Sequence, residues 1–96
     1  MATVTWTIQA IEDLDAICLF IARDAIRPAE MFAERVFRAA EQLGHFPLSG
    51  RAVPEIGSPD IREVFVGNYR LIYRVASHDE VEVLTIHHGA RLLGDL

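Results

Sequence analysis

Several polar side chains in the second half of the chain are of types that serve in acid–base chemistry. They are one carboxylate, two guanidinium groups and two imidazoles: Glu55, Arg62, His87, His88 and Arg91. Acid–base catalysis on an anionic substrate needs a base, a cation that stabilises the negative charge and an acid. Glutamate, arginine and histidine can fill these roles. Glu55, Arg62 and His88 are therefore the candidate catalytic residues.

Each of these side chains also has a structural interpretation. Glu55 follows Pro54 in a loop, where a carboxylate commonly pairs with an arginine, and Arg62 and Glu63 are suited to cross-strand pairing. His88 precedes a glycine and could simply end the last strand. His87 and His88 are neighbours on a strand and point to opposite faces, so we expect no metal site. No cofactor is expected either.

A second set of arginines is suited to binding a partner rather than to catalysis. Arg70 and Arg74 share one face of a predicted strand, while Tyr69 and Tyr73 share the other. Residues 1–24 carry a balance of −3 and residues 45–75 a balance of +1, so the loop and the sheet form the basic region. The candidate residues for binding a partner or target are Arg51, Arg70, Arg74 and Arg91.

Composition limits the function classes. The chain has 96 residues and a net charge of −5, which disfavours generic nucleic-acid binding. All nine basic residues are arginines, so a lysine general base is excluded. The single cysteine, Cys18, allows no internal disulfide and lies on an apolar helical stripe. With no leader pattern and no apolar run of membrane length, we expect a cytoplasmic protein without a membrane partner.

The elements that must position these residues follow from periodicity, and we expect one domain over residues 1–96. Residues 3–7 favour an edge strand. Apolar residues at helical spacing predict a helix over 10–25 and a second helix that begins at Pro28 and ends at Gly44. Acidic residues near the start of the first helix favour its dipole: Glu12, Asp13 and Asp15. The short connection indicates an antiparallel helical hairpin.

The last third of the chain predicts three strands, 61–66, 69–75 and 81–87, joined by tight turns as an antiparallel meander. The fold class is α+β, with an N-terminal strand, a long helical hairpin and the meander, and with the helices on one face of the sheet. Strict alternation in the last strand places Val81 and Val83 on one face and Leu84 and Ile86 on the other. Part of the second face is then left for a partner chain to cover.

The order of these segments resembles the RelE/ParE superfamily, the toxins of bacterial type II toxin–antitoxin and plasmid-stabilisation systems. Six segments carry the resemblance over nearly the whole chain: residues 10–17, 46–51, 53–55, 61–63, 69–75 and 87–91. The resemblance implies a growth-inhibiting toxin neutralised by an antitoxin from the adjacent gene, in a toxin–antitoxin hetero-oligomer.

The resemblance implies two possible targets. ParE-like members inhibit DNA gyrase by binding, without chemistry of their own. The long helical hairpin of this chain favours a ParE-like toxin. RelE-like members cut mRNA in the ribosome, and one relative resembles a microbial RNase in using Glu, Arg and His. A lysine-based cleavage mechanism is impossible here because the chain has no lysine. A ribosome-dependent endoribonuclease would therefore use Glu55, Arg62 and His88. Whether the chain is an enzyme stays open.

Overall fold

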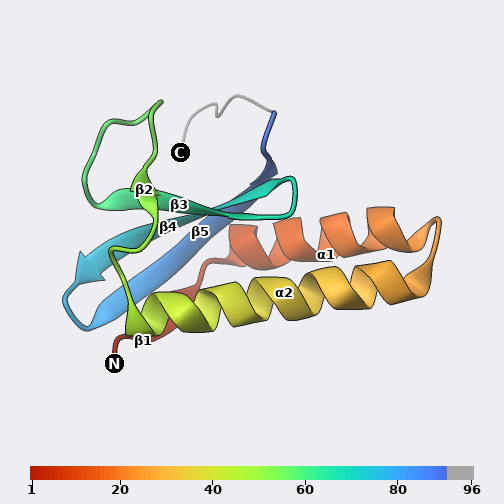
Figure 1. Cartoon of the computed structure of the whole chain (residues 1–96), viewed down its shortest axis with the longest axis horizontal. Coiled ribbons are helices and arrows are strands. Elements are labelled where there is room, and N and C mark those ends of the chain that lie inside the picture. The colour runs from red at the N-terminus through yellow and green to blue at the C-terminus, as the bar shows by residue number, and fades with distance from the viewer. Residues whose placement is uncertain (91–96) are drawn as a thin grey trace.

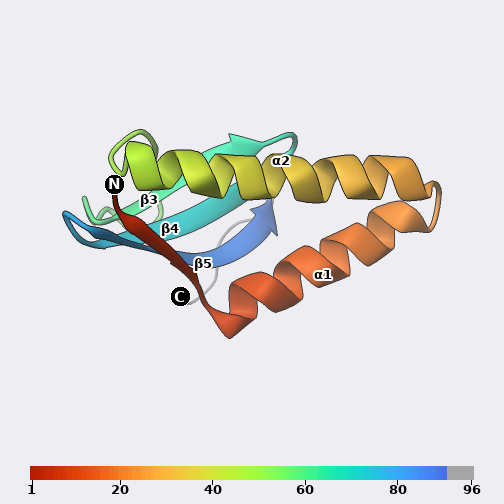
Figure 2. The same ribbon diagram turned by 90° about the horizontal axis from the view of Figure 1, so that it is seen from below.

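The computed structural model describes residues 1–90, which form two helices and a sheet of five strands. Both helices lie on the same face of the sheet (Figures 1 and 2), and the predicted α+β class is confirmed. The elements in chain order are β1 (Thr3–Trp6), α1 (Ile8–Ala22), α2 (Ile26–His45), β2 (Arg51–Ala52), β3 (Ile61–Val66), β4 (Tyr69–Ser77) and β5 (Glu80–His88).

The sheet is mixed, with the strand order β1-β5-β4-β3-β2. Strands β3, β4 and β5 form the predicted antiparallel meander. Strand β1 is at one edge, as predicted, and pairs in parallel with β5 from Thr3↔Glu80 to Trp6↔Val83. Strand β2 was not predicted, because it is only two residues long and polar or small in composition. It pairs with β3 at the other edge.

The ends of both helices differ from the prediction. Helix α1 begins at Ile8, because the hydroxyl of Thr7 accepts a hydrogen bond from the backbone N–H of Ala10 at 3.0 Å and caps the helix. Helix α2 begins at Ile26, so Pro28 lies in its first turn and not at its first residue. A proline is tolerated there because the N–H groups of the first turn have no partner within the helix.

Gly44 does not terminate α2, as the sequence had suggested. The helix continues to His45, and Gly44 is buried where the N-terminus crosses it. Its carbonyl accepts a hydrogen bond from the N–H of Ala2 at 2.8 Å. A β-carbon at this position would lie 3.0 Å from the carbonyl oxygen of Ala2 and 3.2 Å from Val4 Cγ2. The absence of a side chain therefore permits close approach of two backbones.

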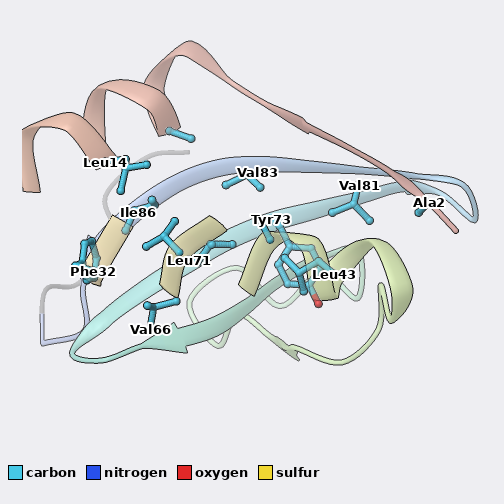
Figure 3. Close-up of a cluster of buried hydrophobic side chains, with 13 residues drawn as sticks. Ala2, Leu14, Phe32, Leu43, Val66, Leu71, Tyr73, Val81, Val83 and Ile86 are labelled. Carbon is cyan, nitrogen blue, oxygen red and sulfur yellow. The ribbon is translucent and has the colours of Figure 1, made fainter. Parts of the chain in front are cut away.

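The hydrophobic core lies between the helices and the sheet (Figure 3). Strict alternation fails in β5, because a register shift separates Tyr73↔Val83 from Ile72↔Thr85 and leaves Leu84 as an extra residue. Ile86 consequently packs in the same core as Val83, and its predicted place on the opposite face is wrong. The core residues labelled in the figure are Ala2, Leu14, Phe32, Leu43, Val66, Leu71, Tyr73, Val81, Val83 and Ile86.

The start of α1 completes the edge of β5 beyond the end of β1. The Thr7 hydroxyl donates to the carbonyl of Leu84 at 2.6 Å. A carboxylate oxygen of Asp13 accepts from the N–H of Ile86 at 3.1 Å and from the hydroxyl of Thr85. Asp13 therefore stabilises an open strand edge. Because α1 begins at Ile8, its first turn contains no acidic residue, and the helix-dipole interpretation of Glu12, Asp13 and Asp15 is wrong.

Candidate functional site

The face of the sheet opposite the helices carries a cluster of four charged side chains, Arg51, Glu55, Glu63 and Arg70, called the charged cluster below. Arg51 belongs to β2, Glu63 to β3 and Arg70 to β4, and Glu55 comes from the loop after β2. Strand pairing places Arg51 directly opposite Glu63, since the two are register partners. Four segments separated in sequence thus bring opposite charges together.

Glu63 is the centre of the charged cluster. Its side chain is fully buried, and its two carboxylate oxygens accept from Arg51 Nε and Arg70 Nε, each at 2.6 Å. Arg70 is only 5% exposed and donates from Nη1 and Nη2 to the two oxygens of Glu55, at 2.7 and 2.8 Å. This paired geometry is the strong form of an arginine–carboxylate interaction. The structural interpretation of Glu55 is confirmed.

Arg70 is a fixed cation. Its hydrogen bond with Glu55, and then those with Glu63, raise the pKa of its guanidinium against the opposing effect of burial. A buried charge is tolerated only when it is paired and hydrogen-bonded, and both carboxylates meet that requirement here. The charged cluster can therefore hold a loop in place and present charge, while both oxygens of Glu55 are engaged with a guanidinium.

The three candidate catalytic side chains lie in different surroundings. Within residues 1–90, Glu55, Arg62 and His88 make no hydrogen bond to one another. Arg62 donates to backbone carbonyls, at 2.8 Å to Gly50 and at 2.9 Å to Pro59, and so fastens the loop on either side of β2.

The His88 ring packs edge-on against Tyr69, with a centroid distance of 5.4 Å. Its Nδ1 accepts from the N–H of Ala90 at 3.2 Å. Strand register pairs His88 with Tyr69 and His87 with Arg70. His87, which was not chosen as the catalytic imidazole, is therefore the cross-strand neighbour of the charged cluster.

Tyr73 anchors the segment that leads into β2 and Arg51. Its buried hydroxyl donates to the carbonyl of Pro47 at 2.7 Å and accepts from the N–H of Gly50 at 2.9 Å. A β-carbon at Gly50 would lie 2.5 Å from the carbonyl oxygen of Glu63, so only glycine fits. Burial raises the pKa of the Tyr73 phenol, which keeps it a hydrogen-bond donor.

The other candidate arginines are more exposed. Arg74 forms an ion pair with its cross-strand neighbour Glu82 at 3.0 Å, and its side chain is 45% exposed. As predicted, it shares its face with Arg70, while Tyr69 and Tyr73 pack with the core. Arg91 lies outside the residues that the structure describes.

The expected cross-strand pairing of Glu63 is confirmed with Arg51, whereas its complete burial and its second partner Arg70 were not predicted. The strand on the second side of Glu63 is β2, which was not predicted, and for this reason the sequence did not reveal how deeply this carboxylate is buried.

A hollow of about 220 Å³ lies beside the end of β5. Asp13, Tyr69, His87 and His88 line it, together with apolar residues of α1. In the described part of the chain, no three His, Cys, Asp or Glu side chains are placed to share a metal ion. The hollow therefore offers aromatic and imidazole surface rather than a metal site. Likewise, none of the helices described is long and apolar enough to span a membrane.

The tip of the helical hairpin projects beyond the end of the sheet (Figures 1 and 2). It carries large apolar side chains that are more than half exposed: Leu19 at 63%, Phe20 at 62% and Ile26 at 69%. We call these three residues the tip patch. Exposed large apolar side chains gathered at one end of an element are more typical of a protein–protein contact than of a catalytic site.

The chain is similar to known toxins over nearly its whole length. Residues 4–93 match the family model described as the ParE toxin of type II toxin–antitoxin systems, parDE. Toxin RelE2 of Caulobacter vibrioides is 37% identical over 93 residues, which cover 96% of this chain and 100% of the relative. The putative toxin Y4kP of Sinorhizobium fredii is 32% identical over 88 residues, covering 90% of this chain and 86% of the relative.

Two solved structures share the fold. One is the chromosomal ParDE toxin–antitoxin system of P. aeruginosa, with a TM-score of 0.75 and 21% identity over 92% of this chain and 96% of that chain. The other is the RelBE2 toxin–antitoxin complex of Mycobacterium tuberculosis, with a TM-score of 0.61 and 26% identity over 91% and 96%.

Proposed function

The chain belongs to the family of ParE toxins of type II toxin–antitoxin systems, and we propose that it inhibits DNA gyrase by binding and is neutralised by a cognate antitoxin. The observation that carries this proposal is the tip patch. Leu19, Phe20 and Ile26 belong to the two helix ends that meet at the projecting tip of the hairpin, and these exposed residues are not members of the core cluster. Exposing such side chains is unfavourable unless a partner covers them.

The charged cluster supports a binding function rather than catalysis. A general base must be able to take a proton from its substrate. Both oxygens of Glu55 accept hydrogen bonds from Arg70, whose guanidinium stabilises the charged carboxylate. The ion pairs of the charged cluster instead hold β2, which carries Arg51, and the following loop, which carries Glu55, against the sheet.

The proposal is tested with purified toxin in two parallel assays, gyrase supercoiling of relaxed plasmid and mRNA integrity in a translating extract. We expect loss of supercoiling with intact mRNA. Phe20→Asp should abolish the inhibition, while Phe46→Asp, at a similarly exposed phenylalanine far from the tip, should retain it. Unchanged supercoiling at excess toxin, with mRNA cut, would refute the proposal.

The alternative function is a ribosome-dependent endoribonuclease that uses Glu55, Arg62 and His88. The observation in its favour is the concentration of carboxylates and guanidinium groups beside an imidazole, since His87 pairs with Arg70 across the strands. Under this alternative, Glu55→Ala and His88→Ala abolish growth arrest in folded protein. Retained growth arrest in both variants would eliminate it.

A further inference from the structure

The connection between the two helices is short and closed by its own backbone. It consists of residues 23–25, between the end of α1 and the start of α2. The N–H groups of Asp24 and Ala25 both donate to the carbonyl of Ile21, at 3.2 and 3.3 Å. These bonds satisfy a carbonyl that has no partner within the last turn of α1. The tip of the hairpin is therefore an ordered turn, and the side chains beside it have defined positions.

Arg23 lies beside the tip patch and contacts one of its members. Its guanidinium carbon is 5.9 Å from the centroid of the Phe20 ring, a cation–π distance, and both side chains are exposed. None of the ion pairs formed among residues 1–90 involves Arg23. The ring and the cation thus form one unit that is open to solvent, and no carboxylate of the described chain pairs with its charge.

The tip is cationic although the protein is acidic. Residues 19–27 contain two arginines and one aspartate, which gives them a charge of +1, whereas the whole chain carries −5. This charge favours a negatively charged partner surface. The apolar side chains of the tip patch favour a protein pocket over a nucleic-acid backbone, because protein interfaces bury aromatic residues and arginine together at their centres.

We propose that Phe20 and Arg23 act together as the specificity-determining pair of the tip. Phe20 enters an apolar pocket on gyrase, and the guanidinium held over its ring pairs with a carboxylate at the rim of that pocket. Arginine suits this position because its planar group stacks on a ring through its face and bonds a carboxylate through its edge. The inference rests on the proposed gyrase target and adds the chemistry of the surface that the tip recognises.

Arg23 also has a structural role, which the experiment must separate from binding. A cation at the C-terminus of α1 interacts favourably with the helix dipole. Lysine keeps that charge but loses the stacking and the paired hydrogen bonds of the guanidinium. Arg23→Lys should therefore leave the melting temperature unchanged and weaken the Kd for gyrase about fivefold. Arg23→Glu should weaken it about 30-fold or more, because it places like charges opposite each other.

Binding is measured with purified gyrase, first without DNA and then with plasmid. The matched control is Arg38→Glu, which changes the net charge equally at a side chain that is 71% exposed. Arg38 lies about 18 Å along α2 from Ile26, well beyond the distance at which salt screens exposed charges. Its Kd should stay within about twofold of wild type. Equal weakening by Arg23→Glu and Arg38→Glu would show a net-charge effect only and would overturn the proposal.

A double substitution tests whether the ring and the cation act as a pair. Phe20→Leu with Arg23→Lys should weaken binding less than the product of the two single effects, because each single change already disrupts the pair. Independent effects would overturn the pairing. If Arg23→Glu weakened binding only in the presence of plasmid, a DNA phosphate would be the ligand, and the carboxylate on gyrase would be wrong.

Failure of the gyrase target and failure of this inference give different results. Wild-type toxin that neither binds gyrase nor inhibits supercoiling would overturn both. Wild-type toxin that inhibits supercoiling, together with Arg23→Glu toxin that binds gyrase equally well, would overturn only the role of the Phe20–Arg23 pair.

Discussion

The two faces of the sheet are stabilised by different interactions. The face under the helices is closed by apolar side chains such as Leu71 and Val83, which are completely buried. The opposite face buries Glu63 and Arg70, and the burial of these two charges is tolerated because they form an ion pair. Apolar packing is non-directional and tolerates exchanges of equal volume, whereas a buried ion pair tolerates no change of charge. Substitutions of equal size should therefore have very different effects on the two faces.

The largest effect is expected from Glu63→Gln, which keeps the volume and removes the charge. Arg70 would then be buried with Glu55 as its remaining described carboxylate partner, and removing one member of a buried pair costs about 3–5 kcal/mol. Urea unfolding at neutral pH measures the loss. The matched control on the other face is Leu71→Met, which also keeps the volume and should cost less than about 1.5 kcal/mol. Equal losses would show that the two faces do not differ in this way.

A double substitution sharpens the same comparison. Glu63→Leu with Arg70→Leu removes both charges, so neither is left buried and unpaired. Its effect should be smaller than the sum of the two single effects, with a coupling of about 0.5–3 kcal/mol. Additive losses in urea unfolding would mean that the pair is not coupled.

An intermediate effect is expected where the two faces meet, at Tyr73. Its ring lies in the core while its hydroxyl holds the segment that leads into β2. Tyr73→Phe leaves the Gly50 N–H and the Pro47 carbonyl without this partner, at a cost of about 1–3 kcal/mol. Tyr69→Phe is the matched control, since no hydrogen bond of the Tyr69 hydroxyl is part of this anchor.

Tyr73 also gives a pH dependence with a defined sign. Burial raises its pKa in the folded state above the usual value near 10.0. Below pH 10 both states keep the proton and the stability is fully present. As the pH rises above 10, the unfolded state loses its proton first, so stability falls. Unfolding free energies measured from pH 8 to 11 should show this fall, and it should be reduced in Tyr73→Phe. An identical pH profile in the variant would assign the fall to other groups.

Sequence periodicity predicted most of the buried residues on the face under the helices, because apolar residues that face a core recur every 3.6 residues in a helix and every 2 in a strand. It failed at Ile86, where one extra residue in β5 reverses the alternation. The face with the charged cluster could be predicted only in part. Glu55 was expected to pair with an arginine, but which arginine depends on the approach of β2, β3 and β4. Glu63 was expected to form a cross-strand pair, but its burial between Arg51 and Arg70 was not predicted, because these two partners lie on different strands.

The smallest effect is expected at Arg74, which shares the face of the charged cluster but not its burial. Its ion pair with Glu82 is 3.0 Å long, yet the two side chains are 45% and 30% exposed. Water already solvates both charges, so Arg74→Ala should change the unfolding free energy by about 1 kcal/mol or less. The same urea titration measures it, with added salt reducing the difference further. A loss as large as that of Glu63→Gln would mean that position on this face, and not burial, determines the contribution of a charge. A small loss would instead leave Arg74→Ala as a folded variant, in which any weakening of partner binding reports directly on contact with the guanidinium.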